Sequence, residues 1–207
     1  MIFKKIVVGA LEVNCYILGD EFSRKAILID PGADVEKISA LLKKANLRPQ
    51  IIINTHGHFD HIGSDNAWNI PIYIHKDDAE LLSNAEKNFS AWMGAPFKIS
   101  SSNVKFLKDK DWIEVGEIGL EVMHTPGHTP GGICLLLRRH SPMIIFTGDT
   151  LFKGSIGRTD IAGASEELLL NSIKDKVLNL SDETIVCPGH GPESNIGIER
   201  WQNPFLI

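Results

Sequence analysis

The stretch NTHGHFDHIGS, residues 54–64, decides how the rest of the chain is interpreted. It follows the apolar run III at residues 51–53 and carries four potential metal ligands within six positions: His56, His58, Asp60 and His61. Imidazole nitrogens and carboxylate oxygens are common ligands of Zn²⁺, Fe and Mn²⁺. The stretch therefore predicts a metal site where the chain leaves a buried strand.

Three later motifs follow apolar strands in the same way. TPGHTPG at 125–131, TGDT at 147–150 and PGHG at 188–191 supply His128, Asp149 and His190. Strand ends hold loop residues rigidly while their side chains face a cleft. We therefore expect all four motifs to meet at one edge of the sheet structure.

These motifs give seven donors in total, more than the roughly four that a tetrahedral ion uses. The excess predicts two divalent ions, with Zn²⁺ expected and Fe or Mn²⁺ as alternatives. Asp149 is the natural bridge between them. Two ions about 3.5 to 4 Å apart can hold a water and lower its pKa, which is the chemistry of a hydrolase.

His124 lies four residues before His128 in HTPGH and is the alternative to it as a metal ligand. We favour His128 because its turn places it at the cleft.

The bulk composition indicates one domain over residues 1–207, since 43% hydrophobic residues in a chain of this length can bury a full core. With 26 acidic and 21 basic residues there is no basic stripe for nucleic acid.

Glu12 and Asn14 interrupt an N-terminal run that resembles a signal peptide, so we expect a strand there and no membrane association. Three scattered cysteines indicate reduced thiols and a cytoplasmic protein. The oligomeric state is left open.

Strands and helices alternate in two halves. The expected strands are 4–9, 14–20, 25–30, 50–54 and 71–75 in the first half, and 120–125, 131–138, 142–149 and 184–187 in the second. Helices are predicted at 35–45, capped by Asp34, at 76–86 and at 165–180. Residues 150–164 are expected to form a long loop, and 85–103 an irregular segment. Its Phe89, Trp92, Met93 and Phe97 are expected to line part of the substrate cleft, and the alternative is that they belong to the core.

The motifs THGHFDH, GHTPG, TGDT and PGHG, in this order, resemble those of the metallo-β-lactamase-fold hydrolases. Within that superfamily, GSIGRTD at 154–160 and ERWQNPFL at 199–206 are similar to single-domain relatives of glyoxalase II, the hydroxyacylglutathione hydrolases. The resemblance implies a four-layer αββα sandwich of the mixed α/β (α+β) type, in which each half of the chain gives one sheet covered by helices.

The resemblance also implies how the ligands are divided. His56, His58 and His128 would hold one metal, Asp60, His61 and His190 the other, and Asp149 both. In the family a metal-bridging hydroxide attacks a thioester such as S-lactoylglutathione, and the thiolate leaves. Asp60 would both bind metal and orient the hydroxide.

Arg158 is the candidate for substrate binding. It stands where the family has glutathione-contacting residues, and its guanidinium could bind a substrate carboxylate. The alternative is a structural ion pair with Asp160. The helical domain through which full-length glyoxalase II contacts glutathione is not expected in the 17 residues after His190.

Three other functions stay open at this point. A persulfide dioxygenase resembles the chain even in GRTD, but it uses one iron held by two histidines and an aspartate. A metallo-hydrolase of another ester or a lactone would use the same donors. A non-enzymatic protein would keep its ions as structural staples in a closed tetrahedral site.

Overall fold

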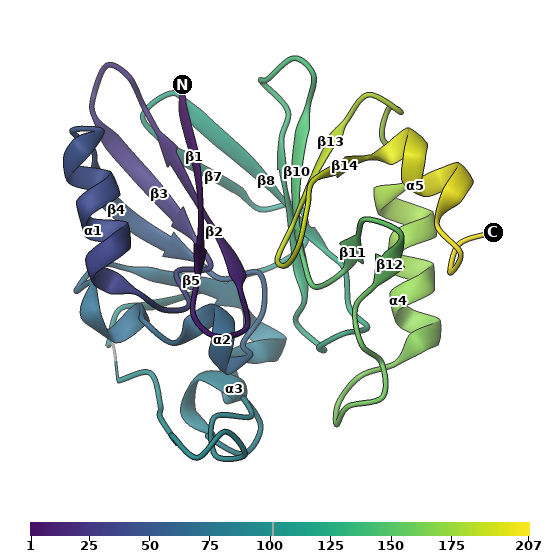
Figure 1. Cartoon of the computed structure of the whole chain (residues 1–207), viewed down its shortest axis with the longest axis horizontal. Helices are drawn as coiled ribbons and strands as arrows, with labels where there is room; N and C mark the ends of the chain where they lie inside the picture. The colour runs from purple at the N-terminus through teal and green to yellow at the C-terminus, as the bar shows by residue number, and fades with distance from the viewer. Residues whose placement is uncertain (101) are drawn as a thin grey trace.

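The computed structural model describes residues 1–100 and 102–207. Two six-stranded mixed sheets face each other, and helices cover their outer faces (Figure 1). The helix α1 (Val35–Lys44) lies outside the first sheet, and α4 (Glu166–Ser172) and α5 (Ile196–Gln202) lie outside the second (Figure 1). The expected αββα sandwich is confirmed, with each half of the chain forming one sheet.

The first sheet has the strand order β1-β2-β3-β4-β5-β6. The first three strands are antiparallel and the last four pair in parallel. Its strands are β1 (Ile2–Val8), β2 (Val13–Gly19), β3 (Lys25–Ile29), β4 (Arg48–Ile53), β5 (Ile72–His75) and β6 (Val104–Leu107). Between them lie the short helices α2 (Phe59–Ile62) and α3 (Ala79–Ser83) and the 3₁₀ turns Asp65–Ala67 and Lys76–Asp78.

The second sheet has the order β14-β13-β10-β9-β8-β7, and only β10 and β13 pair in parallel. Its strands are β7 (Trp112–Val115), β8 (Ile118–His124), β9 (Ile133–Leu137), β10 (Ile144–Gly148), β13 (Ile185–Pro188) and β14 (Ser194–Asn195). A separate hairpin joins β11 (Leu151–Phe152) to β12 (Ser155–Ile156), and α4 continues as a π-helical turn at Ile173–Val177.

The apolar runs of the sequence are explained by burial on both faces of each sheet. In β2, Tyr16 and Leu18 pack between the sheets, while Cys15 and Ile17 pack with Ile38 of α1. The same alternation in β9 sends Leu135 and Leu137 inward, and Cys134 and Leu136 outward onto α4. Successive side chains of a strand point to opposite faces, so a strand covered on both sides is apolar throughout.

The helix predicted at 35–45 is present, and its buried residues Ile38 and Leu42 belong to the predicted apolar face. The predicted role of Asp34 is wrong. Asp34 occupies the cap position with a left-handed backbone, φ 55°, and its side chain makes no cap hydrogen bond. Its carboxylate instead accepts from the Gly9 amide and pairs with Lys37 at 2.6 Å.

The remaining differences concern short elements. The loop predicted at 150–164 contains the β11–β12 hairpin, and the helix predicted at 76–86 is a 3₁₀ turn followed by α3. The sequence interpretation missed β6, β7, β14 and α5, none of them longer than seven residues. Between 85 and 103 the described residues form neither helix nor strand, as expected. In the described part of the chain, no helix has the length and apolar character to cross a bilayer.

Candidate metal centre

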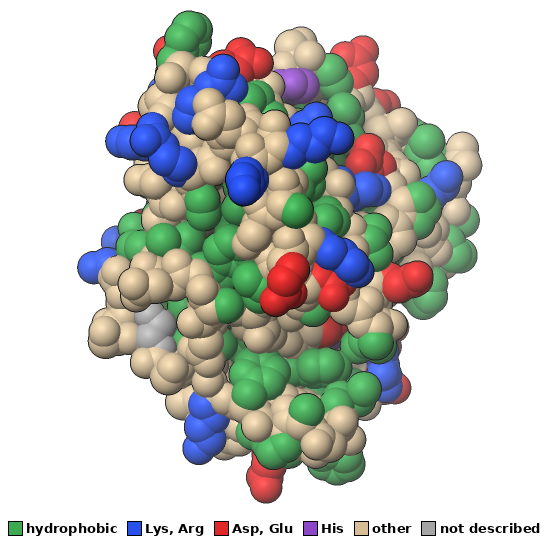
Figure 2. Space-filling model, turned by 60° about the vertical axis from the view of Figure 1, so that its left-hand side comes forward, with side chains coloured by type: hydrophobic (Ala, Val, Ile, Leu, Met, Phe, Trp, Pro, Cys, Tyr) green, Lys and Arg blue, Asp and Glu red, His purple; other side chains and the backbone are tan. Residues whose placement is uncertain are grey.

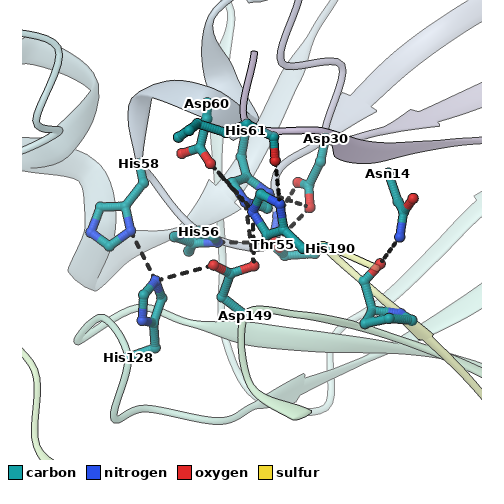
Figure 3. Close-up of polar contacts among 12 residues, drawn as sticks. Asn14, Asp30, Thr55, His56, His58, Asp60, His61, His128, Asp149 and His190 are labelled. Carbon is teal, nitrogen blue, oxygen red and sulfur yellow. Dashed lines mark hydrogen bonds and ion pairs between the residues drawn. The ribbon is translucent and has the colours of Figure 1, made fainter. Parts of the chain in front are cut away.

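The four sequence motifs meet at one edge of the sandwich because the strands before them run the same way. β8 and β10 are both antiparallel to β9, and β13 is parallel to β10, so all three end at the same edge. β4 of the facing sheet delivers residues 54–61 to that edge (Figure 3). The seven predicted donors gather there.

Their ligand atoms form two main groups of three. One is His56, His58 and His128, the other is Asp60, His61 and His190, and within each group the atoms lie within 4.8 Å of one another. Asp149 lies between the two groups (Figure 3), with Oδ2 3.6 Å from His128 Nε2 and Oδ1 3.4 Å from His61 Nε2. We call the first group the three-histidine half-site and the second the mixed half-site. The side chains are grouped as the implied division of the ligands requires, and their assignment to two ions stays a prediction.

Hydrogen bonds on the outer nitrogens fix three of the rings. His61 Nδ1 lies 3.0 Å from an Asp30 carboxylate oxygen, His128 Nδ1 2.9 Å from the Arg158 carbonyl, and His190 Nδ1 2.9 Å from the Leu11 carbonyl. These oxygens can only accept, so each Nδ1 carries the proton when the ring is neutral. Each Nε2 then presents its lone pair to the centre, which is the orientation that metal-binding histidines need.

Two observations test whether divalent ions fit these residues. His56 Nε2 is buried and has no hydrogen-bond partner among the described residues. His58 Nδ1 lies 2.9 Å from His128 Nε2, and His61 Nε2 lies 3.3 Å from His190 Nε2. Two nitrogen ligands of a tetrahedral ion with bonds of about 2.0–2.1 Å stand about 3.3–3.4 Å apart. The pair in the mixed half-site has this spacing, whereas the pair in the three-histidine half-site is closer. The N and O donor set of both half-sites suits a divalent cation.

The two half-sites differ in charge. Burial and the surrounding imidazoles lower the pKa of His56, and the same causes lower the pKa of His58 to about 3. Burial also opposes protonation of His61, but Asp60, Asp149 and Asp30 outweigh it and raise its pKa. His56 and His58 are thus favoured as neutral donors, whereas in the mixed half-site the carboxylates favour a proton on His61 until a cation replaces it.

Two buried aspartates that the sequence interpretation missed hold the ligands in place. Asp30, directly after β3, accepts from the Thr55 amide and hydroxyl at 2.7 Å each as well as from His61. Asp78 accepts from the amides of Gly57 and Gly131 and from the Thr129 hydroxyl, at 2.6 to 2.9 Å. The position of Asp30 after a strand, facing the same edge, is the signal that could have revealed it. Asp78 gave no such signal.

A glycine is required next to His190. A side chain at Gly189 would place its Cβ 2.5 Å from Asp149 Oδ1 and 2.8 Å from His61 Cε1. The PGHG turn therefore brings its backbone against the ligands themselves. Asn14 donates to the carbonyls of Pro188 and Gly191, one on each side of the turn, at 2.9 Å.

The side chain of Arg158 forms the ion pair with Asp160 that the sequence left open as the alternative to substrate binding, through two contacts of 2.9 and 3.0 Å, and both side chains are exposed. Its backbone carbonyl is the group that contacts the centre, through His128. His124 lies apart from the seven donors: its Nε2 donates to the Pro130 carbonyl and its ring stacks on His75 at 3.9 Å.

A cleft of about 410 Å³ opens beside His58, and we call it the main cleft. Phe89 and Trp92 line it, and the Phe89 ring lies 4.9 Å from the His58 ring. Met93 and Phe97 instead line a smaller pocket of about 190 Å³ next to Asp60. The four aromatic and apolar side chains predicted to line the cleft are therefore divided between two depressions beside the centre.

Comparison with known proteins assigns the family. Residues 8–190 match the profile of the Metallo-beta-lactamase superfamily, so the chain belongs to that superfamily. A probable metallo-hydrolase, YqgX, of Bacillus subtilis is 36% identical over 100% of this chain and 98% of its own length. The hydroxyacylglutathione hydrolase GloC of Haemophilus influenzae is 34% identical over 97% of this chain and 96% of its own.

Solved structures agree with the fold. The BLEG-1 B3 metallo-beta-lactamase superposes with a TM-score of 0.92 at 38% identity, covering 99% of both chains. TTHA1623, solved in a di-iron-bound form, superposes with a TM-score of 0.85 at 34% identity, over 98% of this chain and 100% of its own. The chain is thus a metallo-beta-lactamase-fold protein with a His and Asp cluster suited to divalent metal, and its relatives include metallo-hydrolases.

Proposed function

We propose that the protein is a dinuclear metal-dependent hydrolase that cleaves thioesters of the S-lactoylglutathione type. The observation that carries the proposal is the pair of half-sites joined by Asp149, which opens onto the main cleft at His58. The proposed ligands are His56, His58, Asp60, His61, His128, Asp149 and His190. Zn²⁺ is the expected ion, and the di-iron form of TTHA1623 supports iron as the alternative.

When bound, two divalent cations would supply a water of lowered pKa and polarise the scissile carbonyl. The chain's own residues would position the reactants. Asp60 lies 3.3 Å from His190 Nε2 and is only partly buried, so its carboxylate can accept a hydrogen bond from the attacking water. Phe89 beside His58 would exclude bulk water from that side.

A thioester suits this centre because the leaving group needs little protonation. A thiol of ordinary pKa, about 8.5, departs as the thiolate without a strong general acid. Four of the histidines make a hydrogen bond through Nδ1: His56 to Thr55, His61 to Asp30, His128 to Arg158 and His190 to Leu11. None of these four Nδ1 atoms is therefore free to protonate the leaving group. We place the reaction in the cytoplasm, in line with three buried, unpaired cysteines.

The test measures metal content and thioester turnover on the same preparation. We expect about two divalent ions per chain and hydrolysis of S-lactoylglutathione that stops when a chelator removes the ions and returns when they are restored. Fully metallated protein that leaves every thioester intact would refute the proposal.

Two controls separate the alternatives. Oxygen consumption with glutathione persulfide, and one iron per chain, would identify a persulfide dioxygenase instead. Hydrolysis of a β-lactam faster than of any thioester would point to the chemistry named for BLEG-1. Simple carboxylic esters and lactones belong in the same panel.

A further inference from the structure

The main cleft has an apolar wall that begins at the metal centre. His58 forms its inner end, and Leu81, Phe89, Trp92 and Pro130 provide apolar surface. Trp92 is 80% exposed although it is a large apolar side chain. Hydrophobic side chains gather on the lower part of the molecular face in Figure 2, at the level that residues 84–97 occupy in Figure 1. The cleft therefore offers contact surface to the part of a substrate that extends away from the reacting carbonyl.

The rim of this cleft is acidic. Asp77, Glu80 and Glu86 line it, and Lys87 is its one lysine or arginine among the described residues. Lys87 Nζ lies 2.6 Å from Glu80, so its charge is already paired within the protein. Glu86 has no ion-pair partner within the described part of the chain, and Asp77 faces His75, whose pKa burial lowers.

Arg158 does not compensate for these carboxylates. Its guanidinium makes two contacts with Asp160, and the neighbouring residues Ala162 and Gly163 that reach the cleft carry no charge. Glutathione in a thioester has two carboxylates and one ammonium group, so its net charge is −1. Such a molecule would place its anionic ends against a rim of the same sign.

The smaller pocket next to Asp60 differs in size and polarity. Val8, Leu11, Met93 and Phe97 line it, and Asp60 is its one charged residue within the described part of the chain. Its volume, about 190 Å³ against about 410 Å³, suits a short acyl group better than a thiol the size of a tripeptide. The two depressions adjoin different half-sites, so a thioester whose carbonyl lies at the centre can extend its acyl group into one and its thiol part into the other.

We infer that the main cleft holds the thiol part of the thioester and selects thiols that are neutral or cationic over anionic ones such as glutathione. The inference rests on the proposed function and names the substrate class within it. Water adds to the carbonyl carbon, the C–S bond breaks, the sulfur leaves as a thiolate with the bonding electrons, and the acyl group becomes a carboxylate, while the two protons of the water pass to solvent. Only the charge of the departing thiol is selected.

The substrate pair for the test differs in net charge and in two ethyl groups, and the salt dependence isolates the part due to charge. S-lactoylglutathione is compared with the S-lactoyl thioester of glutathione diethyl ester, which has the same acyl group and no carboxylates. At about 10 mM salt, where the Debye length is near 30 Å, we expect kcat/KM to be roughly tenfold higher for the diester. The ratio should fall toward one at about 0.5 M salt, because the rim carboxylates are exposed and screened.

The variant E80Q/E86Q supplies the second arm, with Glu36→Gln on α1, at the outer face of the first sheet, as the matched control. The double variant should raise kcat/KM for S-lactoylglutathione about threefold to tenfold at low salt and leave the diester nearly unchanged. Glu36→Gln should change neither. A preference for the anionic thioester, or a double variant that alters both substrates equally, would overturn the inference.

Binding without turnover separates this inference from the proposed function. S-methylglutathione and its diethyl ester cannot be hydrolysed as thioesters, and their binding is followed by quenching of tryptophan fluorescence, with Trp92→Phe to identify the signal. Tighter binding of the diester in a protein that hydrolyses no thioester would refute the function and retain the cleft's charge selectivity. If the charge of the acyl group rather than that of the thiol governs kcat/KM, the assignment of the two depressions is wrong.

Discussion

The two half-sites are built from similar residues but differ in exposure and charge. His56, His58 and His128 are all buried, and no carboxylate belongs to their group. In the mixed half-site His61 is fully buried, whereas the side chain of His190 is 27% exposed. The comparison teaches that one centre can combine two buried histidines that resist protonation, His56 and His58, with a half-site whose carboxylates favour a proton on His61 in competition with a cation.

The change with the largest expected effect removes the residue that the half-sites share. Asp149→Asn should lower metal content well below that of the parent protein and reduce kcat/KM by at least about 10³-fold, since each 1.36 kcal/mol of lost stabilisation is tenfold in rate. Elemental analysis and thioester assays measure both quantities. Asp175→Asn, at an exposed position after α4, is the matched control. Normal metal content in Asp149→Asn would exclude the bridging role.

Removing one ligand from each half-site tests the asymmetry directly. His190→Ala should leave about one ion per chain, because the three-histidine half-site keeps all its own donors, and activity should fall by at least about 10²-fold. His58→Ala should instead deplete the buried ion. A titration with a chelator distinguishes the two variants. Equal loss of both ions in either variant would show that the half-sites do not bind independently.

The supporting aspartates extend the comparison beyond the ligands. Asp30→Asn should weaken metal binding in the mixed half-site by about 10- to 100-fold, because a carboxylate that orients a ligating histidine contributes that much. Asp78→Asn should act on the three-histidine half-site through the Gly57 and Thr129 contacts. Competition with a chromophoric chelator reports the affinities, and circular dichroism checks the fold. An effect on activity without any change in affinity would contradict this assignment.

The edge of the sandwich opposite the centre offers a pH test that involves no metal. The amides of Glu117, Ser23 and Phe22 donate to Asp20 and hold its pKa below the ordinary value. A lowered folded-state pKa adds stability above the unfolded value near about 3.9, and that stability is lost as the pH falls through the folded value. The difference in unfolding free energy between the parent and Asp20→Asn, both metal-free, should therefore shrink below about pH 4. A constant difference would contradict the contacts.

The smallest expected effect concerns the wall of the main cleft. Trp92→Ala should raise KM for a thioester about threefold with little change in kcat, because Trp92 contributes contact area away from the reacting carbonyl. Trp201→Ala, also exposed but on α5, is the control and should leave KM unchanged. An unaltered KM in a folded Trp92→Ala variant would remove the cleft assignment.

Much of the fold could be predicted because its strands are long, apolar and covered on both faces. β2, β4, β9 and β10 were evident for that reason, and the donors were evident because ligand-type residues cluster after them. The short strands β6, β7 and β14 gave no comparable pattern because they are partly exposed and mix polar with apolar residues. The strands β5 and β13 are no longer than β6, but their apolar runs are mostly buried. The cap hydrogen bond predicted for Asp34 is absent, because Asp34 has a left-handed backbone conformation. That conformation depends on the turn before α1.

The sequence by itself determined the types of donor, their order along the chain and the alternation that produces two sheets. Tertiary structure alone decided which atoms of those donors face the centre. His128 and His190 are oriented by the carbonyls of Arg158 and Leu11, 30 and 179 residues away along the chain. Every residue carries a carbonyl, so no side-chain pattern marks the one that will accept. Only the packing of the two sheets brings these acceptors to the outer nitrogens and so turns each Nε2 toward its half-site.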